Sequence, residues 1–426
     1  MRRNMEAMQD TLQRQNELIE RQQRRIDELE SRMGTAAAPE APYEAIGSTA
    51  PVGISSPEPT APGALPPTPA GTRPGGLPGQ IGSLLPEIGL VADVVATSTE
   101  DKADAEGNDR VAVRHAELVL GSNVDPYSRL DASLTFSDFE AAGVEEAYLT
   151  RWGLPADLTA RFGRFFPKVG KQASIHRDSL PTVDEPLVIR RYFGSEGYFR
   201  TGADITRIFE GIAGWLLQPS FGVLEGGTGE GGTAFGGARR RPTIYSHLKT
   251  YKDLSDSSSF ELGGTHMLGS SDTDSELEVN VFGLDATYLN NLTPTSKLLL
   301  QSEVFVQHRD ESFTVAEKEF TLADDSTVIA PETTTFNRHP WGAYFLADYR
   351  FAPRWSVGGR VDHVRLSGTP GRSFDQGFSA FLTFYQSEWA RWRLQYRHEE
   401  RAAEPTDDAV MLQGTFAIGT HKHKLQ

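Results

Sequence analysis

The stretch LLLQSEVFVQHRD, residues 298–310, alternates between two kinds of side chain. Its even positions include Leu300 and Val304, whereas its odd positions include Gln301 and Glu303. Successive side chains of a β-strand point to opposite faces, so this pattern predicts a strand with one apolar face and one largely polar face. Whether the apolar face meets a protein core or lipid decides the fold.

Runs with the same alternation recur from residue 84 to the end of the chain, and they predict about sixteen strands. Each run is roughly ten residues long, which is the length of a tilted strand that crosses a bilayer. The expected strands lie near residues 87–98, 110–121, 127–138, 143–152, 157–166, 197–208, 212–224, 242–253, 258–269, 276–289, 296–308, 339–351, 354–366, 374–387, 389–398 and 408–420.

The connectors between these runs alternate in length. Every second connector is short, as in SNVDP (122–126) and FAPR (351–354), whereas the connectors at 167–196 and 309–338 are long. Transmembrane barrels place tight turns at one end and larger loops at the other. A soluble sandwich gives no reason for this sorting, so the pattern favours an antiparallel transmembrane β-barrel.

The charges on one strand face indicate what fills the barrel. In WARWRLQYR (389–397), Trp392 and Leu394 share one face, and three arginines share the other. Such a set of arginines does not fit a dry core, whereas a water-filled bore accepts it while the opposite face meets lipid. We therefore expect an all-β fold with a polar bore. The residues expected to line the pore are Arg129, Asp131, Arg161, Asp285, Glu303, Arg391, Arg393 and Arg397.

The composition of the 426-residue chain narrows the class of protein. Hydrophobic residues make up 38% of the chain, and no apolar run approaches the roughly 18 residues of a transmembrane helix. The net charge of -16 disfavours binding to nucleic acid. The absence of cysteine excludes disulfides and thiolate metal ligands. No catalytic set, metal site or cofactor is indicated, so we expect a protein that is not an enzyme.

The N-terminal region has a different character. Apolar residues repeat with a heptad period that predicts a coiled coil over residues 1–34, and a solvated helix that pairs with nothing is the alternative. Residues 35–83 are rich in Pro, Gly and Ala and predict a disordered linker before the barrel at 84–426. The start, MRRNMEAMQD, lacks the apolar core of a signal peptide, so we expect the exported chain to begin further upstream. The expected coiled-coil seam comprises Met5, Met8, Leu12, Ile19, Ile26, Leu29 and Met33.

Part of the barrel resembles a known family. The motifs EEAYL (145–149), RFGRFFPKVG (161–170) and YFGSEGYFRTGADIT (192–206) resemble the phosphate-selective type of bacterial outer-membrane porin. The order of coiled coil, Pro-rich linker and barrel is similar as well. The resemblance implies a sixteen-stranded barrel, usually trimeric, through which small solutes diffuse. The chain departs from the family in lacking a signal peptide and in ending with KHKLQ, where many outer-membrane barrels end in an aromatic residue.

The same resemblance implies a role for the connector 167–196. In general porins the loop at this place folds inward and narrows the channel, and a pore selects ions by the charge and diameter of its narrowest ring. Basic residues outnumber acidic ones here, which favours anions; the alternative is that these charges only solvate the wall. The candidate constriction residues are Lys168, Lys171, His176, Arg177, Asp184, Glu185, Arg190 and Arg191.

These observations predict a porin of the Gram-negative outer membrane with a water-filled channel for passive diffusion of small hydrophilic solutes or ions. The expected partners are outer-membrane lipid, lipopolysaccharide and two further copies of the chain in a homotrimer. The N-terminal helix is expected in the periplasm, where it can contact peptidoglycan. Two alternatives remain: an outer-membrane barrel enzyme or specific uptake receptor, and a soluble β-rich structural protein.

Overall fold

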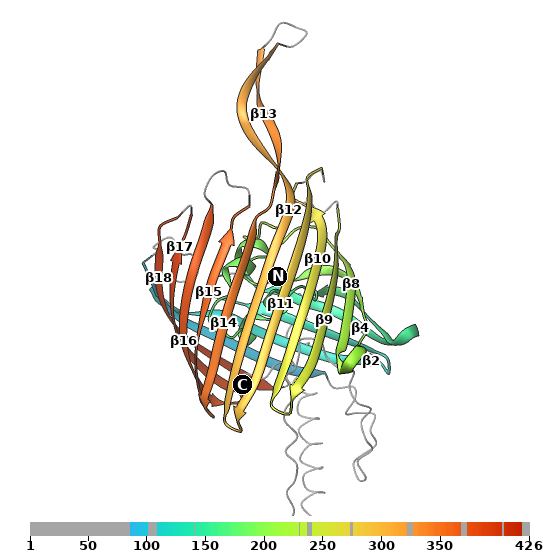
Figure 1. Ribbon diagram of the computed structural model, residues 1–426, viewed down its shortest axis with the longest axis vertical. Helices are drawn as coiled ribbons and strands as arrows, with labels where there is room; N and C mark the ends of the chain where they lie inside the picture. The colour runs from blue at the N-terminus through green and yellow to red at the C-terminus, as the bar shows by residue number, and fades with distance from the viewer. Residues whose placement is uncertain are drawn as a thin grey trace, which may run out of the picture. The chain divides into compact units, whose positions relative to one another are not determined.

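An antiparallel β-barrel makes up most of the described part of the chain (Figure 1). The computed structural model describes residues 86–100, 109–139, 141–229, 231–236, 241–272, 276–321, 327–367, 373–402 and 404–419. The expected coiled coil at 1–34 lies outside these residues, as does all of the expected linker at 35–83. Both therefore stay predictions.

Sixteen strands form the wall of the barrel, and each pairs antiparallel with its neighbours. Two further strands stand apart from this ring: β7 (Phe209–Glu210) pairs with β8, and β13 (Thr327–Arg338) pairs with β12. The wall strands are β1 (Glu87–Thr99), β2 (Arg110–Asp125), β3 (Ser128–Phe136), β4 (Gly143–Leu154), β5 (Leu158–Phe165), β6 (Arg200–Thr206), β8 (Leu216–Leu224), β9 (Thr243–Ser255), β10 (Ser258–Ser270), β11 (Glu278–Thr293), β12 (Ser296–Thr321), β14 (Trp341–Ala352), β15 (Trp355–Arg365), β16 (Phe374–Ser387), β17 (Ala390–Glu400) and β18 (Asp407–Gly419).

The first and last strands close the ring. β1 pairs with β2 on one side and with β18 on the other, in register from Gly89 opposite Gly419 to Thr99 opposite Ala409. A closed ring leaves no strand edge with unpaired backbone groups. The predicted antiparallel barrel of sixteen strands is therefore confirmed, and the wall strands lie close to the expected residues, except that β12 continues past residue 308 to Thr321.

A long β-hairpin extends beyond the wall (Figure 1). β12 pairs with β14 as far as Val306 opposite Trp341, and from Arg309 onward it pairs with β13 instead. The sequence pattern predicts a loop at 309–338, whereas the structure forms two strands there. The alternation that identifies a wall strand separates an outward apolar face from an inward face, and this hairpin extends beyond the wall, where neither face is defined.

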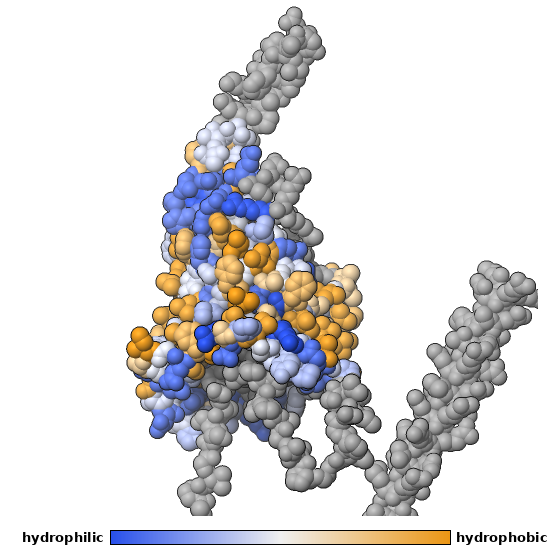
Figure 2. Space-filling view, turned by 90° about the vertical axis from the view of Figure 1, so that its right-hand side faces the viewer, coloured by the Kyte–Doolittle hydropathy of each residue, from blue (hydrophilic) through white to orange (hydrophobic). Residues whose placement is uncertain are grey.

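The outward side chains of the wall are apolar and exposed. On β17, Trp392, Leu394 and Tyr396 are exposed, whereas Arg391 and Arg393 on the opposite face are buried. Figure 2 shows apolar residues across the middle of one side of the barrel and hydrophilic residues above them. An exposed apolar surface of this extent marks contact with lipid or with another protein. Among the described residues, no helix is long and apolar enough to cross a membrane.

The connector between β5 and β6 runs through the inside of the barrel (Figure 1). We call residues 166–199 the inner segment. Its groups contact inward side chains of β2, β4, β10, β12, β15, β16 and β17, so it crosses the bore from one wall to the other. The inner segment contains the short helices η2 (Gln172–Ser174), η3 (Arg177–Ser179) and α2 (Leu187–Tyr192), and two further short helices in turns are η1 (Pro155–Asp157) and η4 (Ile212–Gly214).

Part of the bore is filled by apolar side chains. Val188, Tyr192 and Phe193 of the inner segment belong to one buried cluster with wall residues such as Phe305, whose ring centroid lies 4.9 Å from that of Phe193. Gly342 of β14 leaves room for α2, because an added Cβ there would lie 2.7 Å from Val188 Cγ2. The bore therefore departs from the wholly polar, water-filled space that the sequence predicts.

Candidate functional site

Arginines of β17 hold the inner segment against the wall. Arg393 donates hydrogen bonds from Nη1 to the carbonyl oxygens of Leu180 (3.0 Å) and Thr182 (2.9 Å). Arg391 donates from Nη2 to the carbonyl oxygen of Asp178. Both arginines are on the inward face, where the sequence places them, but they are buried beneath the inner segment. They satisfy main-chain carbonyls that a buried connector would otherwise leave without donors.

Asp184 of the inner segment is the centre of a buried ion-pair network. Its carboxylate lies 3.2 Å from Arg360 Nη2 and 3.1 Å from Arg397 Nη1. Gln395 donates to it from Nε2 at 2.7 Å, and Arg190 Nη2 lies 3.8 Å away. Burial alone would raise the pKa of Asp184, but the guanidinium groups hold that pKa well below its usual range. The charged carboxylate therefore fixes the inner segment to β15 and β17.

Four basic candidates of the predicted constriction form ion pairs with acidic residues, and Lys168 and His176 are described below. Because acidic partners surround these side chains, their charges are largely compensated inside the bore. The excess of basic residues in this connector therefore does not by itself give the constriction a positive net charge. The ion pairs are Lys171 with Glu261 (2.5 Å), Arg177 with Glu185 (3.3 Å), Arg190 with Glu399, and Arg191 with Asp375 (2.7 Å).

Two of the predicted pore-lining arginines lie elsewhere in the wall. Arg129 of β3 contacts Asp131 at 2.9 Å and Glu87 at 2.6 Å. Arg161 of β5 contacts Asp204 of β6 at 2.5 Å. Each of these arginines is thus compensated by a carboxylate from its own or a nearby strand. That they line a conducting pore stays a prediction.

Glu303 of β12 binds the main chain of the inner segment. Its carboxylate accepts hydrogen bonds from the backbone N–H groups of Lys171 (2.7 Å) and Gln172 (3.3 Å). Gly170 permits this approach, because its φ is +58° and an added Cβ would lie 1.7 Å from Glu303 Oε1. Asp285 of β11 is paired with Glu303 in the sheet and is buried as well. Glu303 therefore positions the inner segment and is not a free charge in the bore.

A small cavity between the inner segment and the wall carries a net positive charge. Lys171 and Lys249 share the carboxylate of Glu261, at 2.5 and 2.7 Å. Burial and the nearby Arg161 lower the pKa of Lys168 to about 7. Lys249 is missing from the residues that the sequence predicts, although its inward position follows from the alternation of β9. The cavity, of about 20 Å³, is lined by Lys168, Gly170, Lys171, Ser174, Gln218, His247, Lys249 and Glu261.

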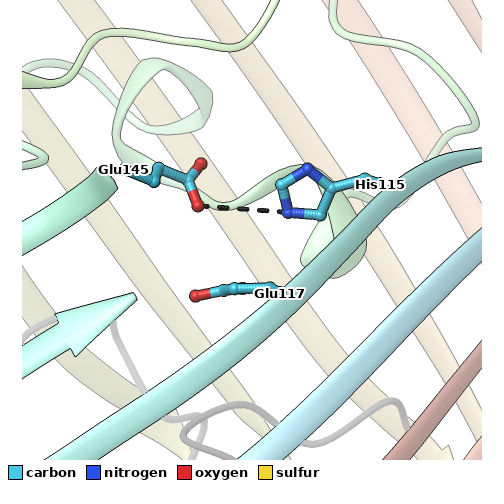
Figure 3. A group of neighbouring side chains, drawn as sticks. All are labelled: His115, Glu117 and Glu145. Atoms are coloured by element: carbon cyan, nitrogen blue, oxygen red, sulfur yellow. Dashed lines mark ion pairs between the residues drawn. The ribbon is translucent and has the colours of Figure 1, made fainter. Parts of the chain in front are cut away.

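A second buried cluster joins the inner segment to β2 and β4 (Figure 3). His115 and Glu117 come from β2, and Glu145 comes from β4. His115 Nε2 lies 3.9 Å from Glu145 Oε2. His176 Nδ1, from the inner segment, lies 3.4 Å from the same oxygen atom and 3.6 Å from Glu117 Oε2. Of these four residues, the sequence indicates only His176.

Two β-bulges bring these side chains together. On β2, Arg114 is an extra residue without a partner on β1, and both Arg114 and His115 are buried on the inward side. On β4, Glu145 is an extra residue without a partner on β3, and both Glu145 and Glu146 are buried on the inward side. A bulge re-aims side chains in this way. Strict alternation would send one member of each pair outward, so the sequence pattern does not reveal the cluster.

The ring of His176 lies among carboxylates on both sides. Its Nε2 lies 3.3 Å from Glu146 Oε2, and the ring of Phe166 lies against it with 4.6 Å between ring centroids. Burial alone would lower the pKa of His176, but the three neighbouring glutamates raise that pKa well above its usual value. The imidazolium form of His176 therefore offsets part of the negative charge of the glutamates.

Known proteins resemble this chain in sequence and in fold. No family model matches the chain. An uncharacterized protein from Aquifex aeolicus (strain VF5) is 25% identical over 351 residues, which cover 72% of this chain and 68% of that protein. At this identity the relative gives no function to this chain.

Solved structures with a similar fold are outer-membrane porins. The anion-selective porin from Comamonas acidovorans is 11% identical, with a TM-score of 0.51 over 78% of this chain and 99% of that chain. OmpF from Salmonella typhi, in complex with daunomycin, is 10% identical, with a TM-score of 0.50 over 78% of this chain and 97% of that chain. This chain therefore has the fold of a porin, a closed β-barrel of sixteen strands, and the phosphate-selective type stays a prediction.

Proposed function

We propose that this chain forms a channel in the bacterial outer membrane through which small hydrophilic solutes or ions diffuse passively. The observation that carries the proposal is the closed ring of strands, with exposed apolar side chains outside and charged side chains inside. Such a ring satisfies the backbone hydrogen bonds within a bilayer. Sixteen strands enclose enough space for an aqueous path. The proposal requires no catalytic residue and no cofactor.

The inner segment is the part that we propose to limit solute size. It crosses the bore, and its apolar residues pack against one part of the wall. A path for solutes must therefore follow the polar remainder of the bore, where side chains such as Arg161 and Lys249 are partly exposed. A bore narrowed in this way fits ions and small solutes better than large ones.

We further propose a preference for anions. Lys168, Lys171 and Lys249 line the same cavity with a single carboxylate, Glu261, so the lining of this cavity carries a net positive charge. A constriction with net positive charge admits anions more readily than cations. The arginines around Asp184 do not contribute, because acidic partners compensate them.

Planar-bilayer recording of the purified full-length chain tests this function. We expect stepwise conductance and, in a salt gradient, a reversal potential on the anion-selective side. Lys249→Glu should keep the conductance steps and move the reversal potential toward cations. Lys252→Glu is the matched control, because Lys252 lies on the opposite face of β9, against Trp215. An absence of steps would contradict a channel, and an unshifted potential in Lys249→Glu would contradict the proposed anion path.

The assembly that we propose is a homotrimer whose N-terminal helix lies in the periplasm. The helix can contact peptidoglycan there, and lipopolysaccharide surrounds the long-loop end of the barrel. The heptad positions that would form the coiled coil lie outside the described residues, so the support for a trimer comes from the sequence alone. The mass of the full-length chain in detergent, measured by light scattering, should be that of three copies. A monomeric mass would contradict the trimer.

A further inference from the structure

We propose that the buried cluster of His115, Glu117, Glu145 and His176 is a binding site for a divalent transition-metal ion such as Zn²⁺. The site joins the inner segment to β2 and β4 at the inner face of the wall (Figure 3). This inference does not depend on the proposed channel function. It departs from the expectation, drawn from the sequence, that the chain has no metal site.

The spacing of the ligand atoms fits one shared ion. Nitrogen and oxygen atoms bound to tetrahedral Zn²⁺ at about 2.0–2.2 Å lie roughly 3.4 Å from one another. The separation between His176 Nδ1 and Glu145 Oε2 is 3.4 Å, and that between His176 Nδ1 and Glu117 Oε2 is 3.6 Å. The separation between His115 Nε2 and Glu145 Oε2 is 3.9 Å. The ligand atoms of His115, Glu117 and Glu145 all lie within 4.8 Å of one another, and so do those of Glu117, His176 and Asp178, so the two sets share Glu117.

His115 provides an independent reason to expect a ligand. Its side chain is 3% exposed, and its Nε2 atom has no hydrogen-bond partner within the described part of the chain. Figure 3 shows this atom directed toward the carboxylate of Glu145. A buried polar atom without a partner destabilises the folded protein, because burial removes its hydrogen bonds with water. A metal ion would give this nitrogen the partner that it lacks.

His176 is oriented as a metal-bound histidine usually is. Its Nδ1 atom faces the proposed ion, while its Nε2 atom lies 3.3 Å from Glu146 Oε2. In metal sites the second ring nitrogen commonly donates to a carboxylate, which fixes the ring orientation and raises the basicity of the ligand. Glu146 is itself fixed, because its Oε1 atom accepts a hydrogen bond from the backbone N–H of Phe166. Glu146 is thus a positioning residue for the site.

The chemistry of the ligands selects the class of ion. Two imidazoles and two carboxylates suit Zn²⁺ and its neighbours among the first-row divalent ions. Ca²⁺ takes six to eight oxygen ligands, which this cluster does not offer. The site also carries an excess of carboxylates, with Glu146 and Asp178 close by. A divalent cation would compensate this negative charge in a region from which water is largely excluded.

Zinc binding by the full-length protein, purified without a His tag, tests the proposal. We expect one Zn²⁺ per chain by metal analysis after dialysis. The variant His115→Ala should weaken zinc binding by more than the roughly 10–100-fold that follows loss of an outer hydrogen-bond partner. Glu146→Gln should weaken binding within that range of about 10–100-fold. Co²⁺ in place of zinc should give the strong visible absorption of a four-coordinate site.

Two control variants separate this site from other histidines. His363→Gln changes a histidine on the outward face of β15 and should leave zinc binding unchanged. The paired change His421→Gln and His423→Gln removes the histidines of HKHK (421–424) and should also leave it unchanged. Heat-dependent migration of each variant on a gel shows whether its barrel is folded, and Glu145→Gln provides a conservative ligand change should His115→Ala not fold.

Three results would overturn the proposal. The first is the absence of stoichiometric zinc in the folded wild-type protein. The second is zinc binding of wild-type strength in a folded variant that lacks both His115 and His176, or in folded Glu145→Gln. The third is loss of zinc in the variant that lacks His421 and His423, because the tail would then be the binding site.

Discussion

The inner segment is held by two buried charged clusters, and they differ in how their charges are balanced. Around Asp184, guanidinium groups and the amide of Gln395 supply donors to a single carboxylate. Around His176, three glutamates face one imidazole ring, and His115 Nε2 has no hydrogen-bond partner among the described residues. Cationic groups thus outnumber the central carboxylate in the first cluster, whereas carboxylates outnumber the imidazole that they face in the second.

This difference indicates that buried charges have two roles in one barrel, as a permanent anchor and as a cluster whose charge state can change. A carboxylate surrounded by fixed donors is charged at any ordinary pH, so the Asp184 cluster is an anchor for the inner segment. A group of carboxylates with too few cations changes its charge state or its ligand with the surroundings. The histidine and glutamate cluster therefore holds the same segment through contacts that depend on the charge state and the ligand of the cluster.

The largest effect should follow removal of Asp184. Asp184→Ala deprives Arg360 and Arg397 of the carboxylate that they share, and loss of one partner of a buried pair lowers the free energy of unfolding by about 3–5 kcal/mol. Urea unfolding in detergent micelles measures the change. Asp184→Asn keeps the size of the side chain and should lose less. A loss of about 1 kcal/mol or less, typical of a surface ion pair, would contradict the anchor.

A cation placed outside the bore should be less harmful than loss of the anchor but still unfavourable. Leu394 lies on the outward face of β17, between inward Arg393 and Gln395. Leu394→Arg should lower the free energy of unfolding by about 2–4 kcal/mol in a bilayer, as for a charge near the membrane midplane. Unfolding in lipid vesicles measures this, with Leu394→Met as the control. Equal stability of the arginine variant would show that this face does not meet lipid.

Neutralisation of one glutamate should act in opposite directions at two places. In protein treated with a chelator, Glu145→Gln removes one charge from a cluster rich in carboxylates and should raise the free energy of unfolding by at most about 1 kcal/mol. Glu303→Gln is the matched change at a carboxylate that accepts two backbone hydrogen bonds, and it should lower that free energy by about 1.5–3 kcal/mol. Equal losses in the two variants would contradict an excess of carboxylates around His176.

The smallest effect concerns pH. Because burial and Arg161 lower the pKa of Lys168 to about 7, its ammonium group is largely charged at pH 6 and largely neutral at pH 8. Anion preference should therefore fall as the pH rises through this range, and the reversal potential in a salt gradient measures it. At both pH 6 and pH 8, Lys168→Gln should have the weaker anion preference that the wild-type protein has at pH 8. The same reversal potential for the wild-type protein at pH 6 and pH 8 would contradict the role of Lys168.

The strands of the barrel could be predicted because the sequence pattern that identifies each strand lies within the strand itself. Alternation within ten or so residues is enough to place a strand in a wall between lipid and a bore, and β17 shows it in Trp392 and Leu394 against Arg391 and Arg393. The inner segment could be expected only from a resemblance. Its path depends on contacts such as that of Arg391 with Asp178, which are 213 residues apart and leave no periodic trace in either segment.

The histidine and glutamate cluster escaped prediction for a different reason. Its side chains reach the bore because bulges on β2 and β4 break the alternation from which faces are assigned. Adjacent charged residues such as Glu145 and Glu146, both buried, are the trace that such a bulge leaves in the sequence. The hairpin of β12 and β13 escaped because it extends beyond the ring of wall strands, where no alternation between an outward and an inward face is required.

The path of the inner segment has a consequence for how the protein is made. Arg190 bonds to Glu399, and Thr182 to Arg360 and Arg393, so the segment's partners are synthesised long after the segment itself. Contacts so distant in sequence form slowly. The ring of strands therefore stays open until β15 to β18 have been added to the early hairpins. These last strands then close the barrel around the inner segment, because the segment could not be threaded through a finished ring.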